Sequence, residues 1–294
     1  MEKNIEESLV PKGLKTDRTK AIIFMNLFVL FFQAYLCVVK LLTTSGVHVL
    51  DLCLIRSTIG FPVAFCMLKF CFREPFFPEA LDRPSQKLLL IRSVCGLFGY
   101  ICFVVAVPSL PLGIFTVIDS TKPIWAAILG LILNKEYLSL FEILTMAGSF
   151  AGIVVIAVSK DSDANTSDNY LLGIGLVLIA SVTLSAIGVL TRQLQHLHYL
   201  VQLAHYQLFA MLALAVIVFG ESLFLWKPLR LTSYSFYQWK LLVLASALNS
   251  IFLQFQTIAF KLERTGFLML IGYIGLIYAF LADIFIFKES FAVG

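Results

Sequence analysis

The chain has 294 residues, of which 60% are hydrophobic and 14% are charged, and its mean hydropathy is +0.92. Soluble domains carry roughly 25% charged residues, so this composition excludes a cytosolic enzyme. The net charge of +4 is small, and the basic residues lie mainly between apolar stretches, which gives no support for nucleic-acid binding.

Nine apolar runs follow one another along the chain, each close to the ~20 residues that cross a ~30 Å hydrocarbon core. They predict transmembrane helices near 21–39, 49–72, 88–107, 112–133, 138–158, 171–190, 201–219, 239–260 and 266–287. The two longest loops, 73–87 and 220–238, are too short to fold as domains. We therefore expect an all-α polytopic (multi-pass) membrane protein whose function lies inside the helix bundle.

The distribution of lysine and arginine predicts the orientation of the chain. Of the 22 basic residues, 13 lie in the N-terminal tail and the loops on its side, 6 lie in the opposite loops and 3 lie inside helices. By the positive-inside rule, the N-terminus is cytoplasmic. No small-residue cleavage pattern follows the first apolar run, so we expect no cleaved signal peptide. These counts do not distinguish the plasma membrane from an endomembrane.

A glycosylation sequon agrees with this topology. Asn165-Thr166-Ser167 lies in a polar loop on the outer or lumenal side, so Asn165 is a candidate acceptor in a glycosylating compartment. The six cysteines have no CxxC spacing and lie in or beside apolar runs. That placement indicates buried small hydrophobic residues rather than disulfides or a metal site.

An internal repeat indicates how the helices are arranged. Shifting the chain by 153 residues aligns Gly113–Leu138 with Gly266–Phe291 without a gap, and Lys135-Glu136 then coincides with Lys288-Glu289. Six of the 26 aligned positions are identical. The shift spans five helices. Because five is odd, the second copy crosses the membrane upside down, as in the inverted repeats of secondary transporters.

Several features of the first half resemble one family. They are Arg92, the helix start Pro111-Leu112-Gly113, Pro123, the turn Asn134-Lys135-Glu136 and the small-residue helix Ala147–Gly152. The chain resembles, over nearly its whole length, the EamA-like members of the drug/metabolite transporter superfamily, close to the solute-carrier 35 group. That resemblance implies ten helices in two inverted five-helix halves, a central substrate cavity and alternating access.

The resemblance divides the chain into a cytoplasmic tail at 1–20, a first EamA-like half at 21–158, a polar outer or lumenal linker at 159–170 and a second half at 171–294. A helix matching 138–158 should follow Lys288-Glu289, but the sequence stops at Gly294, so we expect nine helices with the tenth absent. In the family pattern the fifth and tenth helices are scaffold, which would leave the cavity intact. The alternative to a transporter is a non-transporting membrane scaffold or degenerate carrier.

Charged residues inside apolar helices are costly, roughly 2.5–3.5 kcal/mol each at mid-helix, so each needs a partner or a function. Asp119 and Lys122 are three residues apart on one helix face and can pair directly. The repeat places a second stripe of small residues, which includes Asp283, on the helix at 266–287. We expect the two stripes to face each other across the cavity, with Lys122 contacting an anionic or carbonyl-bearing substrate. A purely structural Asp119–Lys122 pair is equally compatible with the sequence.

Other polar side chains complete the candidate site. Asp283 and Asp119 are candidates for proton or ion coupling, although a buried aspartate can also stay protonated. Arg56 lies about two turns inside its helix and is expected to face the cavity. Arg92 lies within a turn of the inner helix end, where we expect it to anchor the helix at the membrane interface. The other candidate substrate-binding residues are Asn249, Gln256 and Tyr273, while packing is the commoner explanation for His205, Tyr206, Ser181 and Ser185.

An enzyme is not supported, because the sequence contains no GxGD, GxSxG, HExxH or Walker lysine loop. We accordingly expect no catalytic residue, metal or other cofactor. Gly148 and Gly152 form a GxxxG pair, a spacing that permits close helix packing and also a homodimer. The expected partners are a small-molecule substrate and membrane lipid. The sequence predicts secondary-active transport of a small polar organic metabolite, with Arg56 and Lys122 favouring an anion.

Overall fold

The computed structural model describes residues 17–79, 81–135, 168–224 and 230–286, together with residues 143, 144, 147, 148 and 151. The side chains at 168, 169, 280 and 283 are outside this description. No strand occurs in these ranges, so the predicted all-α class is confirmed. The helices are α2 (Arg18–Thr44), α3 (Val49–Cys66), α4 (Arg83–Ala106), α5 (Leu112–Asp119), α6 (Lys122–Leu129), α8 (Asp168–Gln193), α9 (Tyr199–Phe224), α10 (Phe236–Leu262), α11 (Thr265–Ile271) and α12 (Ile274–Phe285).

Seven helical segments are long and apolar enough to cross a membrane, by length and composition. They correspond to the first four predicted helices and to the sixth, seventh and eighth. The ninth predicted helix appears as the shorter pair α11 and α12. The fifth, at 138–158, falls almost wholly outside the described residues, as do Gly152, Asn165 and Lys288-Glu289.

Two helices begin earlier than their apolar runs, because polar side chains cap them. In α4, the backbone N–H of Ser85 donates to Asp82 Oδ1 at 3.0 Å, and Pro84 occupies the first turn. In α10, Ser235 and Gln238 form a reciprocal capping box. Hydropathy detects only the apolar run, so the sequence placed these starts at 88 and 239 instead of at residues 83 and 236.

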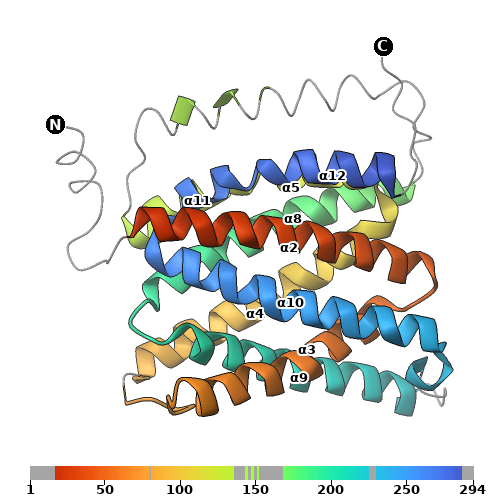
Figure 1. Cartoon of the computed structure of the whole chain (residues 1–294), viewed down its shortest axis with the longest axis horizontal. Coiled ribbons are helices and arrows are strands. Elements are labelled where there is room, and N and C mark those ends of the chain that lie inside the picture. The colour runs from red at the N-terminus through yellow and green to blue at the C-terminus, as the bar shows by residue number, and fades with distance from the viewer. Residues whose placement is uncertain are drawn as a thin grey trace.

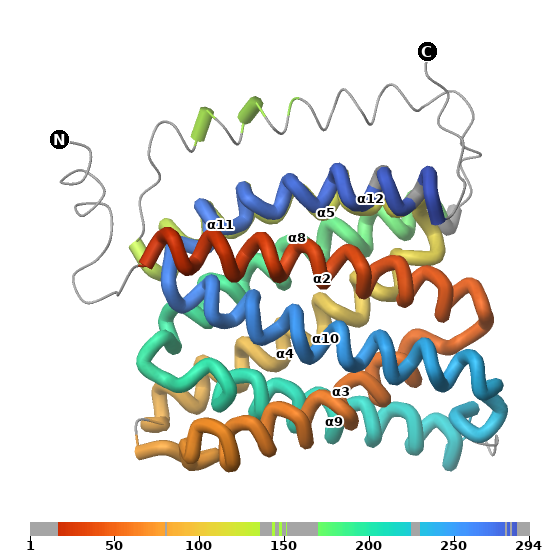
Figure 2. The backbone as a smooth tube through the Cα atoms, in the orientation of Figure 1, coloured from red at the N-terminus to blue at the C-terminus, as the bar shows by residue number. Residues whose placement is uncertain are grey.

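The helices form one elongated bundle with their axes running roughly in one direction (Figure 1). α2 packs against α10, α3 against α9 and α4 against α8, so each of these pairs joins one helix from either half of the chain. The tube in Figure 2 shows the resulting path, with the last helices of the second half lying over α5. The halves are therefore interleaved, and the space at their centre is bounded by both.

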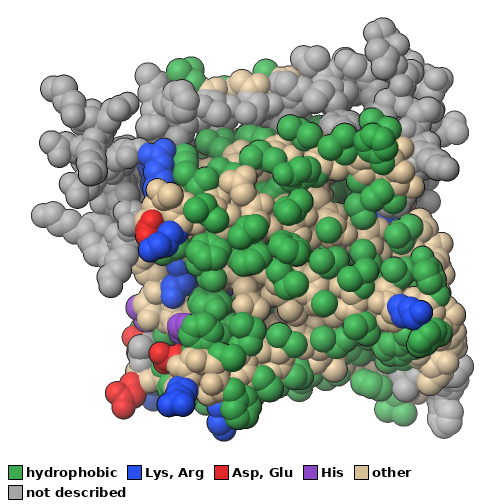
Figure 3. Space-filling model, in the orientation of Figure 1, with side chains coloured by type: hydrophobic (Ala, Val, Ile, Leu, Met, Phe, Trp, Pro, Cys, Tyr) green, Lys and Arg blue, Asp and Glu red, His purple; other side chains and the backbone are tan. Residues whose placement is uncertain are grey.

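Apolar side chains cover most of the outward face shown in Figure 3, whereas lysine, arginine and acidic side chains gather at its left edge, where α2 begins. Large hydrophobic side chains are strongly exposed over the surface of the bundle, for example Val216 at 74% and Leu223 at 76%. Such exposure is unfavourable in water and favourable in lipid. The surface thus agrees with an integral, multi-pass membrane protein.

Two of the predicted helices are broken, and the breaks are related by the repeat. The helix predicted at 112–133 divides into α5 and α6 at Ser120-Thr121, and that at 266–287 divides into α11 and α12 at Gly272-Tyr273. In the first break, Pro123 has no N–H to continue the helical ladder. Because α5 packs on α12 and α6 on α11, the two broken helices run antiparallel beside each other.

Candidate functional site

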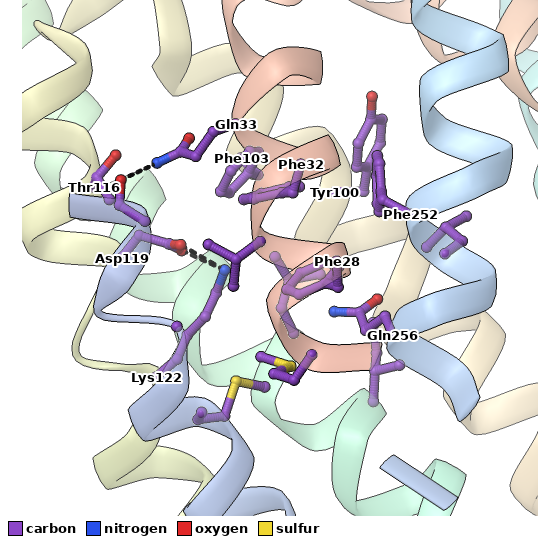
Figure 4. Close-up of a pocket in the computed structure, with 18 of the residues that line it drawn as sticks. Phe28, Phe32, Gln33, Tyr100, Phe103, Thr116, Asp119, Lys122, Phe252 and Gln256 are labelled. Carbon is purple, nitrogen blue, oxygen red and sulfur yellow. Dashed lines mark hydrogen bonds and ion pairs between the residues drawn. The ribbon is translucent and has the colours of Figure 1, made fainter. Parts of the chain in front are cut away.

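A cavity of about 110 Å³ lies between the two halves, at the level of both helix breaks. Figure 4 shows its wall, in which polar groups from the broken helix α5–α6 approach aromatic rings from α2, α4 and α10. At about 10–15 Å³ for each water, this volume corresponds to roughly eight waters. The charged and amide-bearing side chains that line it are Gln33, Arg56, Arg92, Asp119, Lys122 and Gln256.

Asp119 and Lys122 form an ion pair across the first helix break. Lys122 Nζ lies 2.6 Å from one carboxylate oxygen of Asp119 and 2.7 Å from the other, and both side chains are nearly buried. The ammonium group also lies 5.2 Å from the ring centre of Phe103, within the range of a cation–π contact. The two opposite charges therefore compensate each other, in the direct pairing that their three-residue spacing predicted.

Arg56 enters the cavity from α3 and is 1% exposed. Its guanidinium donates to Asn249 Oδ1 at 2.8 Å and to the Tyr206 hydroxyl at 3.0 Å, and its central carbon lies 3.6 Å from the ring centre of Tyr100. The Nε atom is buried and has no hydrogen-bond partner among the described atoms. The sequence placed this cation in the cavity, and the structure does the same. Asn249 lies behind Arg56 and orients it instead of lining the cavity.

Arg92 does not anchor α4 at the membrane interface, contrary to the sequence interpretation. It is 4% exposed and lines the cavity, where its Nε donates to Thr191 Oγ1 at 2.8 Å and its Nη1 to the Gln202 carbonyl oxygen at 3.4 Å. Its two partners lie in the last turn of α8 and the first turn of α9, so these helix ends cover the guanidinium and keep it from the surface.

The two broken helices contact each other directly, and members of both stripes border the cavity beside the breaks. From these two helices the cavity is lined by Thr116, Asp119, Ser120, Lys122, Pro123, Met269, Gly272, Tyr273 and Gly275. The side chain of Asp283 lies outside the described residues. Gln256 and Tyr273 do line the cavity, as proposed for them from the sequence.

The remaining sequence candidates divide into one cavity residue and three packing residues. Tyr206 lines the cavity. His205 instead stacks on Phe76 with ring centres 4.1 Å apart, and its Nδ1 contacts the Val201 carbonyl oxygen. Ser181 and Ser185 donate to carbonyl oxygens in their own helix, and Ser185 Oγ also lies 3.0 Å from the carbonyl oxygen of Lys122.

The aromatic wall was not predicted. Phe32 packs against Phe103 in a tilted arrangement and against Phe252 edge to face, with ring centres 5.6 and 5.3 Å apart, and the ring centres of Tyr35 and Phe252 lie 5.1 Å apart. Aromatic residues make up 14% of this chain and occur in every helix, so their presence alone gives no signal. Gln33 was missed for a different reason. Its partner is the backbone carbonyl of Gly275, 242 residues away, which no residue spacing in the sequence indicates.

The electrostatic balance of the cavity is positive. Among the described lining residues Asp119 is the sole carboxylate, and Lys122 already pairs with it. The described partners of Arg56 and Arg92 are an amide, hydroxyls, a backbone carbonyl and aromatic rings, all of them neutral. Two buried guanidinium groups therefore face one cavity, and neither has a carboxylate partner among the described residues. Among the same residues no cluster of three or more His, Cys, Asp or Glu side chains could hold a metal.

A second charged network lies at the opposite end of the bundle, which the predicted topology makes the outer end. Asp51 in α3 is fully buried and accepts from the Tyr234 hydroxyl at 2.5 Å, while Arg230 Nε lies 3.3 Å from the same oxygen. Arg230 also binds both carboxylate oxygens of Glu221, at 2.9 and 3.0 Å, which raises the pKa of the guanidinium. Burial and the bond to Asp51 raise the pKa of Tyr234 to about 12, so its hydroxyl stays protonated and donates.

Comparison with known proteins places these features in a family. Residues 19–158 match the EamA-like transporter family. A solved crystal structure superimposes with a TM-score of 0.66 at 18% sequence identity, covering 94% of this chain and 91% of its own, which shows a shared fold. No curated protein matches the chain in sequence. Residues 19–158 are thus similar to the EamA-like transporter family, in agreement with the resemblance found in the sequence.

Proposed function

We propose that the protein is a secondary-active transporter that carries a small organic anion across the membrane by alternating access. The family consists of membrane transporters of small molecules, which supports transport as the activity. The observation that supports an anion is the pair Arg56 and Arg92, two buried cations in one cavity with neutral described partners. A bound anion would pair with these two buried cations and offset the free-energy cost of removing them from water.

The helix breaks support a mechanism in which the halves move around the site. Discontinuous helices in corresponding positions of two inverted repeats are typical of secondary transporters, and they bind substrate where the breaks meet. Here both breaks border the cavity. In this proposal the outer network of Asp51, Arg230 and Tyr234 holds the outer side closed in the described conformation, because it joins α3 of the first half to the segment before α10.

Asp119 is the proposed coupling group among the described residues. Its carboxylate forms an ion pair with Lys122 at 2.6 Å. If Lys122 turns towards an anionic substrate, Asp119 loses its counter-ion in a buried position, which favours proton uptake. Binding of the anion and binding of a proton would then be linked. Asp283 remains a second proposed coupling position from the sequence.

Uptake into proteoliposomes tests the proposal. The purified chain should take up a labelled organic anion with saturable kinetics. Arg56→Gln should raise KM or abolish uptake, because it removes the fixed charge and the contact with Asn249. Lys240→Gln is the matched control, since it removes an exposed cation at the outer end of α10. Absence of saturable flux for any organic anion would reject the transport proposal and favour a membrane scaffold.

A further inference from the structure

We infer that the substrate is a small dicarboxylate whose two anionic groups are held separately by Arg56 and Arg92. This inference rests on the proposed transport function and makes it more specific. Each guanidinium is a planar fork that binds a carboxylate through two parallel hydrogen bonds. Both line the same cavity, and neither has a carboxylate partner among the described residues.

The two arginines lie at different depths along the bundle. On α9, Arg92 contacts the carbonyl oxygen of Gln202, whereas Arg56 contacts the hydroxyl of Tyr206, one turn further along. On α4, Arg92 and the Tyr100 ring beneath Arg56 are two turns apart. Along the helix axes these intervals are about 6 Å and about 12 Å, so the contacts of the two guanidinium groups are staggered. Two carboxylates joined by a short carbon chain would place one anionic group at each arginine.

The packing around Tyr206 keeps the path between the two groups narrow. A side chain at Gly96 of α4 would place its Cβ 2.9 Å from the Tyr206 ring, so the glycine is what allows the ring to approach α4. Gly96 and Tyr206 both line the cavity with the two arginines. The cavity of about 110 Å³ that these residues share has room for a small ligand.

Each arginine has a neutral partner that fixes its direction. Thr191 Oγ1 accepts from the Nε of Arg92 at 2.8 Å, and Asn249 Oδ1 accepts from Arg56 at 2.8 Å. A neutral acceptor orients a guanidinium without cancelling its charge, which leaves the full charge for a ligand. An arginine kept only for structure would be expected to pair with a buried acid, as Lys122 does with Asp119.

Competition against uptake of labelled succinate tests this inference in the full chain. Unlabelled malonate, succinate, glutarate and adipate form a length series, while butyrate and glycerol phosphate carry a single anionic group. We expect succinate or glutarate to compete about tenfold better than butyrate, the factor for one additional charge-assisted contact. Equal competition by butyrate, or better competition by glycerol phosphate, would overturn the dicarboxylate inference and leave anion transport standing.

A substitution then assigns the second carboxylate to Arg92. For Arg92→Gln we expect the ratio of kcat/KM for succinate to kcat/KM for butyrate to fall by about tenfold. Both rates come from one preparation, so the amount of folded protein cancels. Lys240→Gln should keep the wild-type ratio. An unchanged ratio in Arg92→Gln would overturn the inference, and if that variant does not fold, the length series on the wild type decides. Absence of saturable uptake for every anion would instead reject the proposed function.

Discussion

The side-chain amide of Gln33 in α2 donates a 2.6 Å hydrogen bond to the carbonyl oxygen of Gly275, 242 residues further along the chain at the start of α12. Gly275 is the second residue of α12, so its carbonyl oxygen also belongs to the helical ladder and Gln33 adds a second donor from another helix. At the break itself Gly272 has no room for a side chain, because a Cβ there would lie 2.9 Å from the carbonyl oxygen of Met269. One amide therefore joins α2 to the start of α12, beside the second break.

We predict that Gln33→Leu lowers the free energy of unfolding by about 0.5–1.5 kcal/mol, the net contribution of one hydrogen bond between two helices. Thermal unfolding in detergent measures the effect. Asn26→Leu is the matched control in the same helix. The Asn26 amide donates to the Ile22 carbonyl oxygen of its own helix, so that bond joins no second helix. A similar loss in both variants would contradict a special role for Gln33.

The Asp119–Lys122 pair can be tested with a double-mutant cycle. Lys122→Met leaves a nearly buried carboxylate without its counter-ion and should destabilise the protein by about 3–5 kcal/mol. Adding Asp119→Asn should restore most of that stability. If the pair also takes part in transport, the stable double variant will still be inactive in proteoliposomes. Recovery of flux together with stability would show that the pair is purely structural.

Tyr100 offers a test of how Arg56 is held. Its ring lies 3.6 Å from the guanidinium carbon, while its buried hydroxyl has no hydrogen-bond partner among the described atoms. Tyr100→Phe keeps the ring and should therefore transport like the wild type. Tyr100→Leu removes the cation–π contact and should raise KM by about 2- to 30-fold, from a contact of about 0.5–2 kcal/mol. Equal KM values for the two variants would show that the ring does not position Arg56.

The outer network predicts an asymmetry between the two sides of the membrane. Arg230→Gln removes the cation that binds both Asp51 and Glu221, which weakens the closed outer end. If the network holds the described conformation, KM measured from the outer side should fall and KM from the inner side should rise. Right-side-out and inside-out vesicles supply the two values. Lys240→Gln, also at the outer end, should leave their ratio unchanged, and an unchanged ratio in Arg230→Gln would contradict a gating role.

Much of the fold was predictable because hydropathy and repeat signals are carried by many residues. Parts of the site were not predictable, and the reason differs from residue to residue. The burial of Arg92 depends on Thr191 and Gln202, which belong to two other helices. Gln33 and Asn249 act on partners far away in the sequence, a backbone carbonyl and another side chain, which no spacing rule identifies. Asp119 and Lys122 were predictable because their partners lie one helical turn apart.

The paired breaks determine which parts of the chain can move together. α5 packs on α12 and α6 packs on α11, so each packed pair combines half-helices from both repeats. Helices that are packed together and move as one body therefore come from both repeats. The parts of the chain that move together differ from the two copies of the repeat. An isolated repeat would lack the complementary surface of every such pair. A chain cut in the linker should consequently transport only when both fragments are made in the same membrane and reassemble there.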